Sequence, residues 1–240
     1  MRLDDHNSFK KTMMKLEKST SAKSRRYDDA CGTAHALEVF GDRWALLVIR
    51  ELMLGPRRFS QLRADLAGVS ASILTQRLSD LERCKVLIKT KLPPPAATPV
   101  YELTEWGYEA EPITSAMGRW AARSPSHDPS RRISGVSLLL SFRTMLDVGR
   151  CGDLDACLGF KFGEDVYGAR LTSNGFSVAQ GISADPRVRF AGAPAALGAA
   201  VYGQTPLARL EAEGVLEISG DRRLAERFLT LFPLPERFDP

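Results

Sequence analysis

The amino-acid sequence predicts an α+β protein with a mostly helical part over residues 31–122 and a C-terminal α+β part over 135–240 that holds an antiparallel sheet. Apolar residues recur at helical spacing in three short runs between residues 35 and 67, each followed by glycine. Two short alternating runs then flank a proline-rich loop at 93–95. After residue 134, one apolar helical run precedes alternating runs that are separated by glycine-containing turns.

The composition is typical of a globular protein of the cytoplasm. Hydrophobic residues make up 44% of the 240 positions and charged residues 26%, close to the averages for globular domains. The four cysteines form no CxxC pair and have no histidine spacing typical of zinc, which predicts reduced thiols and no metal site. No uncharged apolar run approaches the roughly 20 residues that span a bilayer, and the first residues lack the apolar core of a signal peptide. We expect a cytoplasmic protein without a membrane partner.

Positive charge is concentrated in the first half of the chain. Residues 1–30 carry eight basic and five acidic side chains, residues 31–123 twelve and ten, and residues 124–240 thirteen and fourteen. A basic first half favours a polyanionic partner, although the excess is small. Residues 1–30 are polar and lack apolar periodicity, so we expect a disordered basic arm, which either touches DNA phosphates or is only a solvated tail.

The helical part begins with Cys31 and predicts a helix-turn-helix. Short helices are expected over 35–40, 43–54 and 59–67, with Ser60 as a plausible N-cap of the third. A tight turn at Gly68 and Val69 follows, and Ser70 can cap a further helix that extends to Lys85. Two short helices joined by a glycine-containing turn form the helix-turn-helix motif.

The helix over 69–85 has two contrasting faces. At roughly 100° per residue, Leu74, Leu78 and Leu81 fall on one side. Short hydrogen-bonding side chains and one arginine fall on the opposite side. Such a face suits the floor of a DNA major groove, whereas the alternative is a surface helix rich in serine and threonine. Arg77 lies about 140° from Ser72 on this wheel, near the core boundary, which favours a salt bridge to a neighbouring helix over base reading.

The predicted contacts with double-stranded DNA divide into two groups. We expect base-edge contacts from four residues of the polar face and phosphate contacts from basic or hydroxyl residues around it. The base-reading candidates are Ser72, Thr75, Gln76 and Ser79, with Ser70 at the start of their helix. The phosphate candidates are Arg57, Arg58, Ser60, Arg83, Lys89 and Lys91.

A strand, loop and strand follow the helix-turn-helix. Residues 87–91 alternate apolar and basic side chains, three prolines at 93–95 form a loop, and residues 100–103 form a second short strand. This arrangement is a two-stranded wing. Lys89 and Lys91 would point the same way, either toward phosphates or to protect an exposed strand edge.

A helix over 105–122, capped by Thr104, follows the wing. Trp106, Ala110, Ile113, Met117 and Trp120 recur at alternating spacings of four and three, which forms an apolar stripe. The stripe packs either on a partner subunit or within the same chain. Pro112 should kink this helix or mark a join between two segments.

Residues 31–122 resemble the HxlR-type winged helix-turn-helix regulators. The resemblance rests on Cys31, the segment from Ala36 to Glu82 with its Gly-Asp-Arg-Trp and Gly-Pro-Arg-Arg-Phe motifs, the Tyr-x-Leu-Thr-x-x-Gly motif at 101–107, and Trp120. It implies a homodimeric transcriptional regulator, a repressor by expectation, that binds a roughly palindromic operator. The helices before Gly41 and after Thr104 would form the dimer interface. Cys31 matches a position that some relatives use for thiol-based sensing, so it is a possible redox residue or an incidental thiol.

Two features depart from that family. Lys85 stands in the turn after the polar-faced helix, where relatives usually have glycine and where a tight turn prefers it. The wing carries more proline and less charge than in many relatives, so weaker DNA contacts are expected from it.

Residues 123–134 read as a linker, and residues 135–240 as a separate α+β unit. We expect a helix over 136–148, strands over 156–162, 166–172, 176–181 and 188–190, helices over 193–202 and 206–213, a strand over 215–219 and a final helix capped by Asp221. The order, with the segments 202–207, 214–221 and 231–235, resembles a sterol-carrier-protein-2-like domain. The resemblance implies an apolar cavity, small or closed because the first helix and sheet look short, and an apolar small-molecule effector.

Catalysis is not expected. His6, His35 and His127 are scattered, and the sequence has no glycine-rich phosphate loop, GxSxG elbow or HExxH motif, so neither an enzyme nor a cofactor is predicted. The expected function is a DNA-binding regulator modulated by an apolar effector or by thiol oxidation. The alternative is a hydrophobic-ligand or lipid-binding protein whose winged part serves only for dimerisation.

Overall fold

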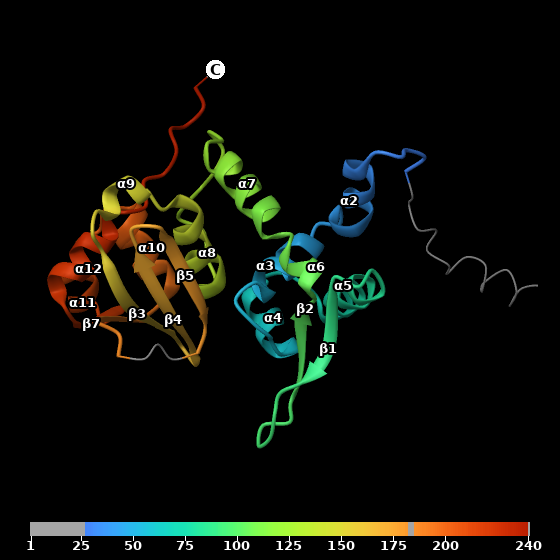
Figure 1. The fold of residues 1–240 in the computed structure, drawn as a ribbon, viewed down its shortest axis with the longest axis horizontal. Coiled ribbons are helices and arrows are strands. Elements are labelled where there is room, and N and C mark those ends of the chain that lie inside the picture. The colour runs from blue at the N-terminus through green and yellow to red at the C-terminus, as the bar shows by residue number, and fades with distance from the viewer. Residues whose placement is uncertain (1–26, 182–184, 240) are drawn as a thin grey trace, which may run out of the picture. The chain divides into compact units, whose positions relative to one another are not determined.

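The structure, a computed structural model, describes residues 27–181 and 185–239 (Figure 1). The basic arm predicted for residues 1–30 therefore falls almost wholly outside the described residues. The chain divides into two compact units, residues 1–42 and 43–240, which are described separately. In the first unit, helix α2 (Gly32–Phe40) has Cys31 at its N-cap, and the Tyr27 backbone amide donates a hydrogen bond of 2.8 Å to Glu38 Oε1.

The second unit begins with the three helices of the predicted helix-turn-helix. They are α3 (Ala45–Leu52), α4 (Phe59–Asp65) and α5 (Ala71–Arg83). Each helix buries the apolar side chains that its spacing places on one face, which is the usual source of stability for such short helices. The shared core consists of Val48, Ile49, Leu52, Leu62, Leu66, Leu74, Leu78 and Leu81.

The start of α4 differs from the prediction. Ser60 is not the N-cap, because it lies inside the first turn and is exposed. Arg58 occupies the cap position, and its backbone amide donates a hydrogen bond of 2.9 Å to Gln61 Oε1. A glutamine three residues into a helix can satisfy the cap amide in this way, so no hydroxyl is required at the cap.

The turn after α5 is tight and places Lys85 at a φ of 59°. The Val86 amide bonds the Leu81 carbonyl at 2.9 Å, and the Lys85 amide bonds the Glu82 carbonyl at 2.9 Å. These two bonds form a Schellman ending, in which the left-handed position favours glycine. The sequence argument that Lys85 occupies a glycine position is confirmed.

The wing consists of β1 (Leu87–Lys91) and β2 (Pro99–Leu103), which pair antiparallel with Leu87 opposite Leu103. Thr104 then caps α6 (Glu105–Tyr108), because its hydroxyl accepts a hydrogen bond of 3.1 Å from the Gly107 amide. A separate helix, α7 (Glu111–Ala122), follows with Pro112 in its first turn. Proline is well suited to this position because its missing N–H is not needed there, so Pro112 marks a join between two helices.

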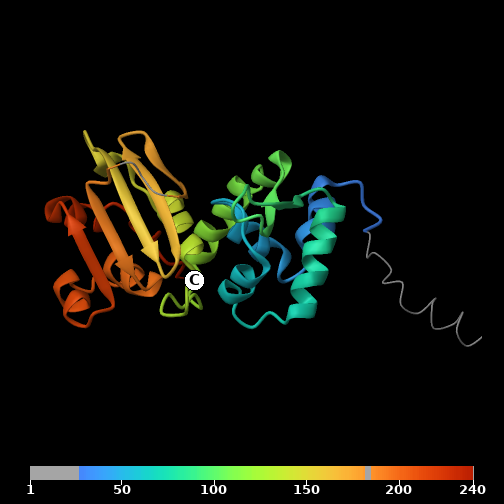
Figure 2. The same cartoon turned by 90° about the horizontal axis from the view of Figure 1, so that it is seen from below.

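The C-terminal part is a five-stranded sheet with helices against one face (Figure 2). Strand residues alternate between buried and exposed, so the other face is open to solvent. The helices are α8 (Gly135–Met145), α9 (Val148–Cys151), α10 (Pro194–Tyr202), α11 (Leu207–Ala212) and α12 (Arg222–Leu229). The strands are β3 (Asp155–Phe162), β4 (Asp165–Thr172), β5 (Gly175–Gln180), β6 (Val188–Gly192) and β7 (Leu216–Gly220).

The sheet is mixed, which corrects the prediction of a purely antiparallel one. The strand order is β5-β4-β3-β6-β7, and β6 pairs with β3 in parallel, with Leu158 opposite Val188. The glycine-containing turns expected at 163–165 and 173–175 are confirmed as hairpin turns, each one residue shorter because Asp165 and Gly175 already belong to the following strands. Strand β5 forms one edge of the sheet, and the next strand, β6, lies on the other side of β3. A crossover connection of this kind allows β6 to run parallel to β3.

Aromatic side chains fill the space between the sheet and its helices. The Phe142 ring lies 4.7 Å from Phe232 and 5.3 Å from Phe228, measured between ring centroids, and Phe160 stacks on Phe190 at 5.5 Å. Such tilted and edge-on contacts are favourable for aromatic rings. The packed rings leave little space for a small-molecule ligand between the sheet and its helices. The apolar interior that the sterol-carrier resemblance implied is therefore occupied by the protein's own phenylalanines.

Candidate nucleic-acid interface

Helix α5 separates an apolar face from a polar one, as its sequence predicts. Leu74, Leu78 and Leu81 are almost completely buried. The four base-reading candidates on the opposite side, Ser72, Thr75, Gln76 and Ser79, are all exposed. Ser70 is the N-cap, and its hydroxyl oxygen accepts a hydrogen bond of 3.2 Å from the Ile73 amide. The structure thus brings these four polar side chains together on one accessible face.

An acidic residue that the sequence argument missed organises this face. Asp80 accepts hydrogen bonds from the Gln76 amide at 3.0 Å and from Arg83 at 2.6 Å. It also forms an ion pair of 3.2 Å with Arg77, which lies three residues earlier on the same helix. Spacings of three and four residues could have revealed the cluster, since such residues are neighbours on a helix surface. Asp80 holds Gln76 and Arg83 in place when no other partner is bound.

Most of the phosphate candidates are accessible. Arg58, Ser60, Arg83, Lys89 and Lys91 are exposed. Lys89 and Lys91 stand two residues apart on β1, and the Lys89 ammonium lies 5.9 Å from the centre of the Tyr101 ring. Alternate residues of a strand point to the same side, so both cations are on one side of the wing.

Arg57 is a correction to the prediction. Its side chain is only 3% exposed, so it cannot reach a phosphate. Its guanidinium donates to Asp165 Oδ2 at 2.7 Å, to the Tyr167 hydroxyl at 2.9 Å, and to Asp65. Burial by itself would lower the guanidinium pKa, but Tyr167, Asp165 and Asp65 together raise it above its ordinary value. Two of these partners lie more than a hundred residues downstream, and no local pattern could have shown them.

The Arg57 backbone fixes a second contact. Its amide and carbonyl each form a hydrogen bond of 2.9 Å with Tyr101 on β2. The Arg57 backbone therefore joins the segment before α4 to the wing. The Arg57 side chain joins α4, through Asp65, to the C-terminal sheet, through Asp165 and Tyr167.

Cys31 is exposed at the N-cap of α2. Backbone hydrogen bonds from Thr33 and Ala34 lower the pKa of its thiol, and the Thr33 side chain adds to the effect. A lower pKa increases the fraction of reactive thiolate, which is the chemical requirement for a sensing cysteine. All four cysteines are unpaired thiols in the structure.

Over residues 27–181 and 185–239, no group of three or more histidine, cysteine, aspartate or glutamate side chains is arranged to hold a metal ion. No helix in this described part of the chain combines the length and apolar character needed to cross a membrane.

Comparison with known proteins matches the N-terminal half. Residues 39–128 fit the profile of the HxlR-like helix-turn-helix. The HTH-type transcriptional regulators YvaP and YodB of Bacillus subtilis (strain 168) are 31% and 33% identical over 86 residues. Each match covers 36% of this chain, and 80% and 77% of the respective relatives. A solved structure of reduced YodB is 30% identical and aligns with a TM-score of 0.36 over 40% of this chain and 94% of its own.

The matched region contains α3, α4, α5, the wing and α7, the elements that build the polar face and its support. The shared sequence extends over most of the length of these relatives, so the similarity is not confined to the short helix-turn-helix motif. The chain belongs to the HxlR-like helix-turn-helix family of transcriptional regulators.

Proposed function

We propose that the protein is a homodimeric, sequence-specific regulator, acting as a repressor in the cytoplasm, that binds a roughly palindromic operator through α5. The observation that carries this proposal is the exposed polar face of α5, where Ser72, Thr75, Gln76 and Ser79 are all accessible. Serine, threonine and glutamine side chains can bond base edges, and the wing lysines can bond phosphates.

The length of α5 limits which residues read bases. Its 13 residues span about 20 Å, so only the N-terminal half can lie deep in a major groove. Ser72, Thr75 and Gln76 belong to that half, whereas Arg83 at the end would meet the backbone. In a dimer the two α5 helices would lie about 34 Å apart, one turn of DNA.

Exposed apolar residues support dimerisation. Ile113, Met117 and Trp120 on α7 are 45%, 51% and 77% exposed, and Trp106 on α6 is 49% exposed. They belong to the apolar stripe of the sequence, while Ala110 is buried. A row of large exposed apolar side chains on one helix is typical of a protein interface. Removing apolar surface from water stabilises the associated form by about 25 cal/mol for each Å² that is buried.

The C-terminal part would modulate operator binding. Its order of elements supports a sterol-carrier-protein-2-like domain, and an apolar small-molecule effector is the matching stimulus. An effector that prefers one arrangement of the winged and C-terminal parts would shift the spacing of the two α5 helices in the dimer. Effector binding and operator binding would then be coupled in free energy. The domain would act as a binding module and not as an enzyme.

Thiol chemistry is a second candidate for the stimulus. It is favoured by the exposed, pKa-lowered thiol of Cys31. YodB, a relative by sequence, has been solved in a reduced form and bound to a quinone. A Cys31→Ser variant that loses its response to an electrophile but still binds DNA would support this route.

A titration of the full chain against the DNA upstream of its own gene tests the proposal. The expected result is a shift that excess unrelated DNA does not abolish at moderate salt, with a dimer by sedimentation. A folded dimer that gives no specific shift would contradict it. That outcome would favour a protein that binds hydrophobic ligands and uses its winged part only for dimerisation.

A further inference from the structure

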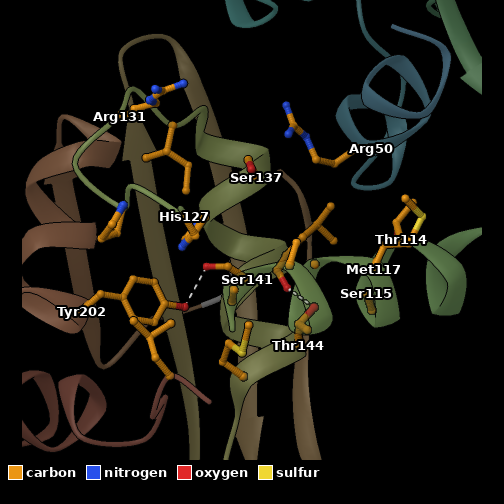
Figure 3. Close-up of a pocket in the computed structure, with 18 of the residues that line it drawn as sticks. Arg50, Thr114, Ser115, Met117, His127, Arg131, Ser137, Ser141, Thr144 and Tyr202 are labelled. Carbon is orange, nitrogen blue, oxygen red and sulfur yellow. Dashed lines mark hydrogen bonds between the residues drawn. The ribbon is translucent and has the colours of Figure 1, made fainter. Parts of the chain in front are cut away.

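We propose that a cleft between α3, α7 and α8 binds an amphipathic organic anion, with an apolar body and one carboxylate, and that this cleft is the effector site. The cleft has a volume of about 640 Å³ (Figure 3). Its walls come from α3 and α7 of the winged part, from α8 of the C-terminal part, and from residues 126–133 that connect the two parts. Pockets for small organic ligands have this size and commonly form where two parts of a chain meet.

The walls that would hold the apolar body are built from aliphatic and small side chains. Leu46 and Leu47 contribute from α3, Leu140 and Met145 from α8, and Gly118 from α7. A Cβ atom added to Gly118 would meet no atom within 4 Å, so the cleft is open at that point of the helix. An aliphatic chain or ring laid along these walls would be removed from water.

Hydroxyl groups on the floor of the cleft are already satisfied by the protein. The Tyr202 hydroxyl lies 2.8 Å from Ser141 Oγ, and the Ser141 and Thr144 hydroxyls donate to carbonyls of α8 at 2.7 and 2.8 Å. Burial raises the pKa of Tyr202 to about 12, so its phenol is neutral at physiological pH. The floor is therefore uncharged, and the part of a ligand that lies on it need not be strongly polar.

Positive charge lies at one end of the cleft. Arg50 and Arg131 stand at the end opposite Tyr202 and Thr144 (Figure 3). Arg132 also lines the cleft, and its hydrogen bond of 2.9 Å goes to the neutral Ala64 carbonyl. Asp128 is the single acidic residue of the lining, and it lies 3.5 Å from the largely exposed Arg131. Arg50 is already bonded to the buried Glu51 at 2.6 Å, so the three arginines face two carboxylates, Glu51 and Asp128. The remaining excess of one positive charge favours an anionic head group, and guanidinium groups bind carboxylates in a two-pronged geometry.

The helices that line the cleft connect it to the DNA-binding face. Helix α3 packs on α5, and α7 packs on both α3 and α8. Helix α7 also carries the exposed apolar residues Ile113 and Trp120, so it borders the proposed dimer interface as well as the cleft. A ligand between α3 and α7 would change how the two helices are held. This regulatory consequence rests on the proposed function, whereas the binding itself does not.

The site is tested on the full chain without DNA. Decanoate is titrated by calorimetry below the concentration at which it forms micelles, beside decyltrimethylammonium, which has the same tail and the opposite charge. We expect saturable binding of decanoate and binding of the cation at least tenfold weaker. Equal binding of both would overturn the assignment of an anion, and no saturable binding of decanoate would overturn the site.

Matched variants locate the binding. Gly118→Leu should weaken decanoate at least tenfold by filling the cleft, whereas Ala116→Leu, on exposed α7 surface outside the lining, should not. Arg131→Gln combined with Arg132→Gln should weaken it at least fivefold. Arg209→Gln, which removes another exposed, ion-paired arginine, is the control and should leave it unchanged. Circular dichroism confirms folding, and variants that bind like the unmodified chain would overturn the location.

A last measurement separates this inference from the proposed function. The DNA titration is repeated with and without saturating decanoate. A change in operator affinity of at least threefold that is lost in Gly118→Leu is expected. Decanoate binding without any change in operator affinity would overturn the regulatory role. A chain that binds decanoate but no DNA would contradict the proposed function and leave the site intact.

Discussion

Arg57 and Asp165 are joined by a hydrogen bond of 2.7 Å between Nη1 and Oδ2, although 108 residues separate them in the sequence. Arg57 lies just before α4, and Asp165 begins β4, so the pair links the helix-turn-helix to the C-terminal sheet. Gln61 Nε2 donates to the other Asp165 oxygen at 3.1 Å, and the Gln180 amide bonds the Leu54 carbonyl at 2.9 Å. The segment that precedes α4 and α5 is therefore anchored to the C-terminal sheet by several polar bonds.

Replacement of Asp165 by asparagine should weaken this anchor. Arg57 would stay buried with one carboxylate fewer, and removal of one partner of a buried pair is costly. Because Asp165 is partly exposed and Asp65 remains, we expect a loss of about 1–3 kcal/mol in the free energy of unfolding, measured with urea. Asp155→Asn, which breaks the exposed pair with Arg170, is the control and should cost less. Equal losses in the two variants would contradict the assigned role of Asp165.

Glu51 should give the stability an unusual dependence on pH. It is fully buried, and Oε1 accepts hydrogen bonds from Ser134 at 2.8 Å and from Arg50 at 2.6 Å, while Oε2 has no partner. Burial raises its pKa above the usual 4.5, against the lowering effect of Arg50. The folded chain then holds the proton more tightly than the unfolded chain does. This proton binding stabilises the folded chain fully when the pH is below the pKa that Glu51 has in the unfolded chain. The stabilisation is lost as the pH rises through the pKa that Glu51 has in the folded chain.

Glu51→Gln should flatten that dependence because glutamine does not titrate. Urea unfolding at pH values from 4.5 upward should show a smaller decline in the free energy of unfolding than in the unmodified chain. Asp65, whose pKa burial also raises, accounts for a residual slope. Glu82→Gln changes an exposed glutamate of α5 and serves as control. An unchanged slope in Glu51→Gln would show that Glu51 is ionised in the folded chain.

Gly107 should tolerate no side chain. A Cβ atom there would overlap the Val86 backbone carbonyl and press on the Leu103 side chain, since α6 passes directly over the wing. We expect Gly107→Ala to lower the free energy of unfolding by about 1–3 kcal/mol. Gly118→Ala on α7 places its methyl in open space and should raise stability by up to about 1 kcal/mol. Thermal unfolding compares the two, and equal behaviour would mean that α6 does not approach the wing this closely.

Local chemistry made the DNA-binding half largely predictable. Ser70 caps α5, leucines recur along its buried side, and prolines interrupt two alternating strands, so every signal lies within a few residues of the element it specifies. The motif at 101–107 also predicts a glycine at position 107, but it does not explain why a side chain is excluded there. The contact with the Val86 carbonyl depends on how α6 packs against the residue that precedes β1.

Long-range contacts made the remainder unpredictable. Arg57 reads as a surface cation because Asp165 and Tyr167 are remote in sequence, and Glu51 reads as an ordinary helix acid because Ser134 is 83 residues away. The parallel pairing of β3 with β6 likewise depends on strand order and not on strand pattern. The size of the apolar cavity implied for the C-terminal part, expected to be small or closed, depends on packing, and six phenylalanines from different elements occupy that space.

The roles assigned to Gln76 and Lys89 test the central claim that α5 reads bases while the wing binds phosphates. Fluorescence anisotropy would measure Gln76→Ala and Lys89→Ala against single-base-pair variants of the operator at several salt concentrations. Gln76→Ala should remove about 1–3 kcal/mol of discrimination at one base pair, with an unchanged salt slope. Lys89→Ala should weaken all sequences alike and reduce the salt slope by about 1. Two variants that alter preference and salt dependence in the same way would contradict this division of labour.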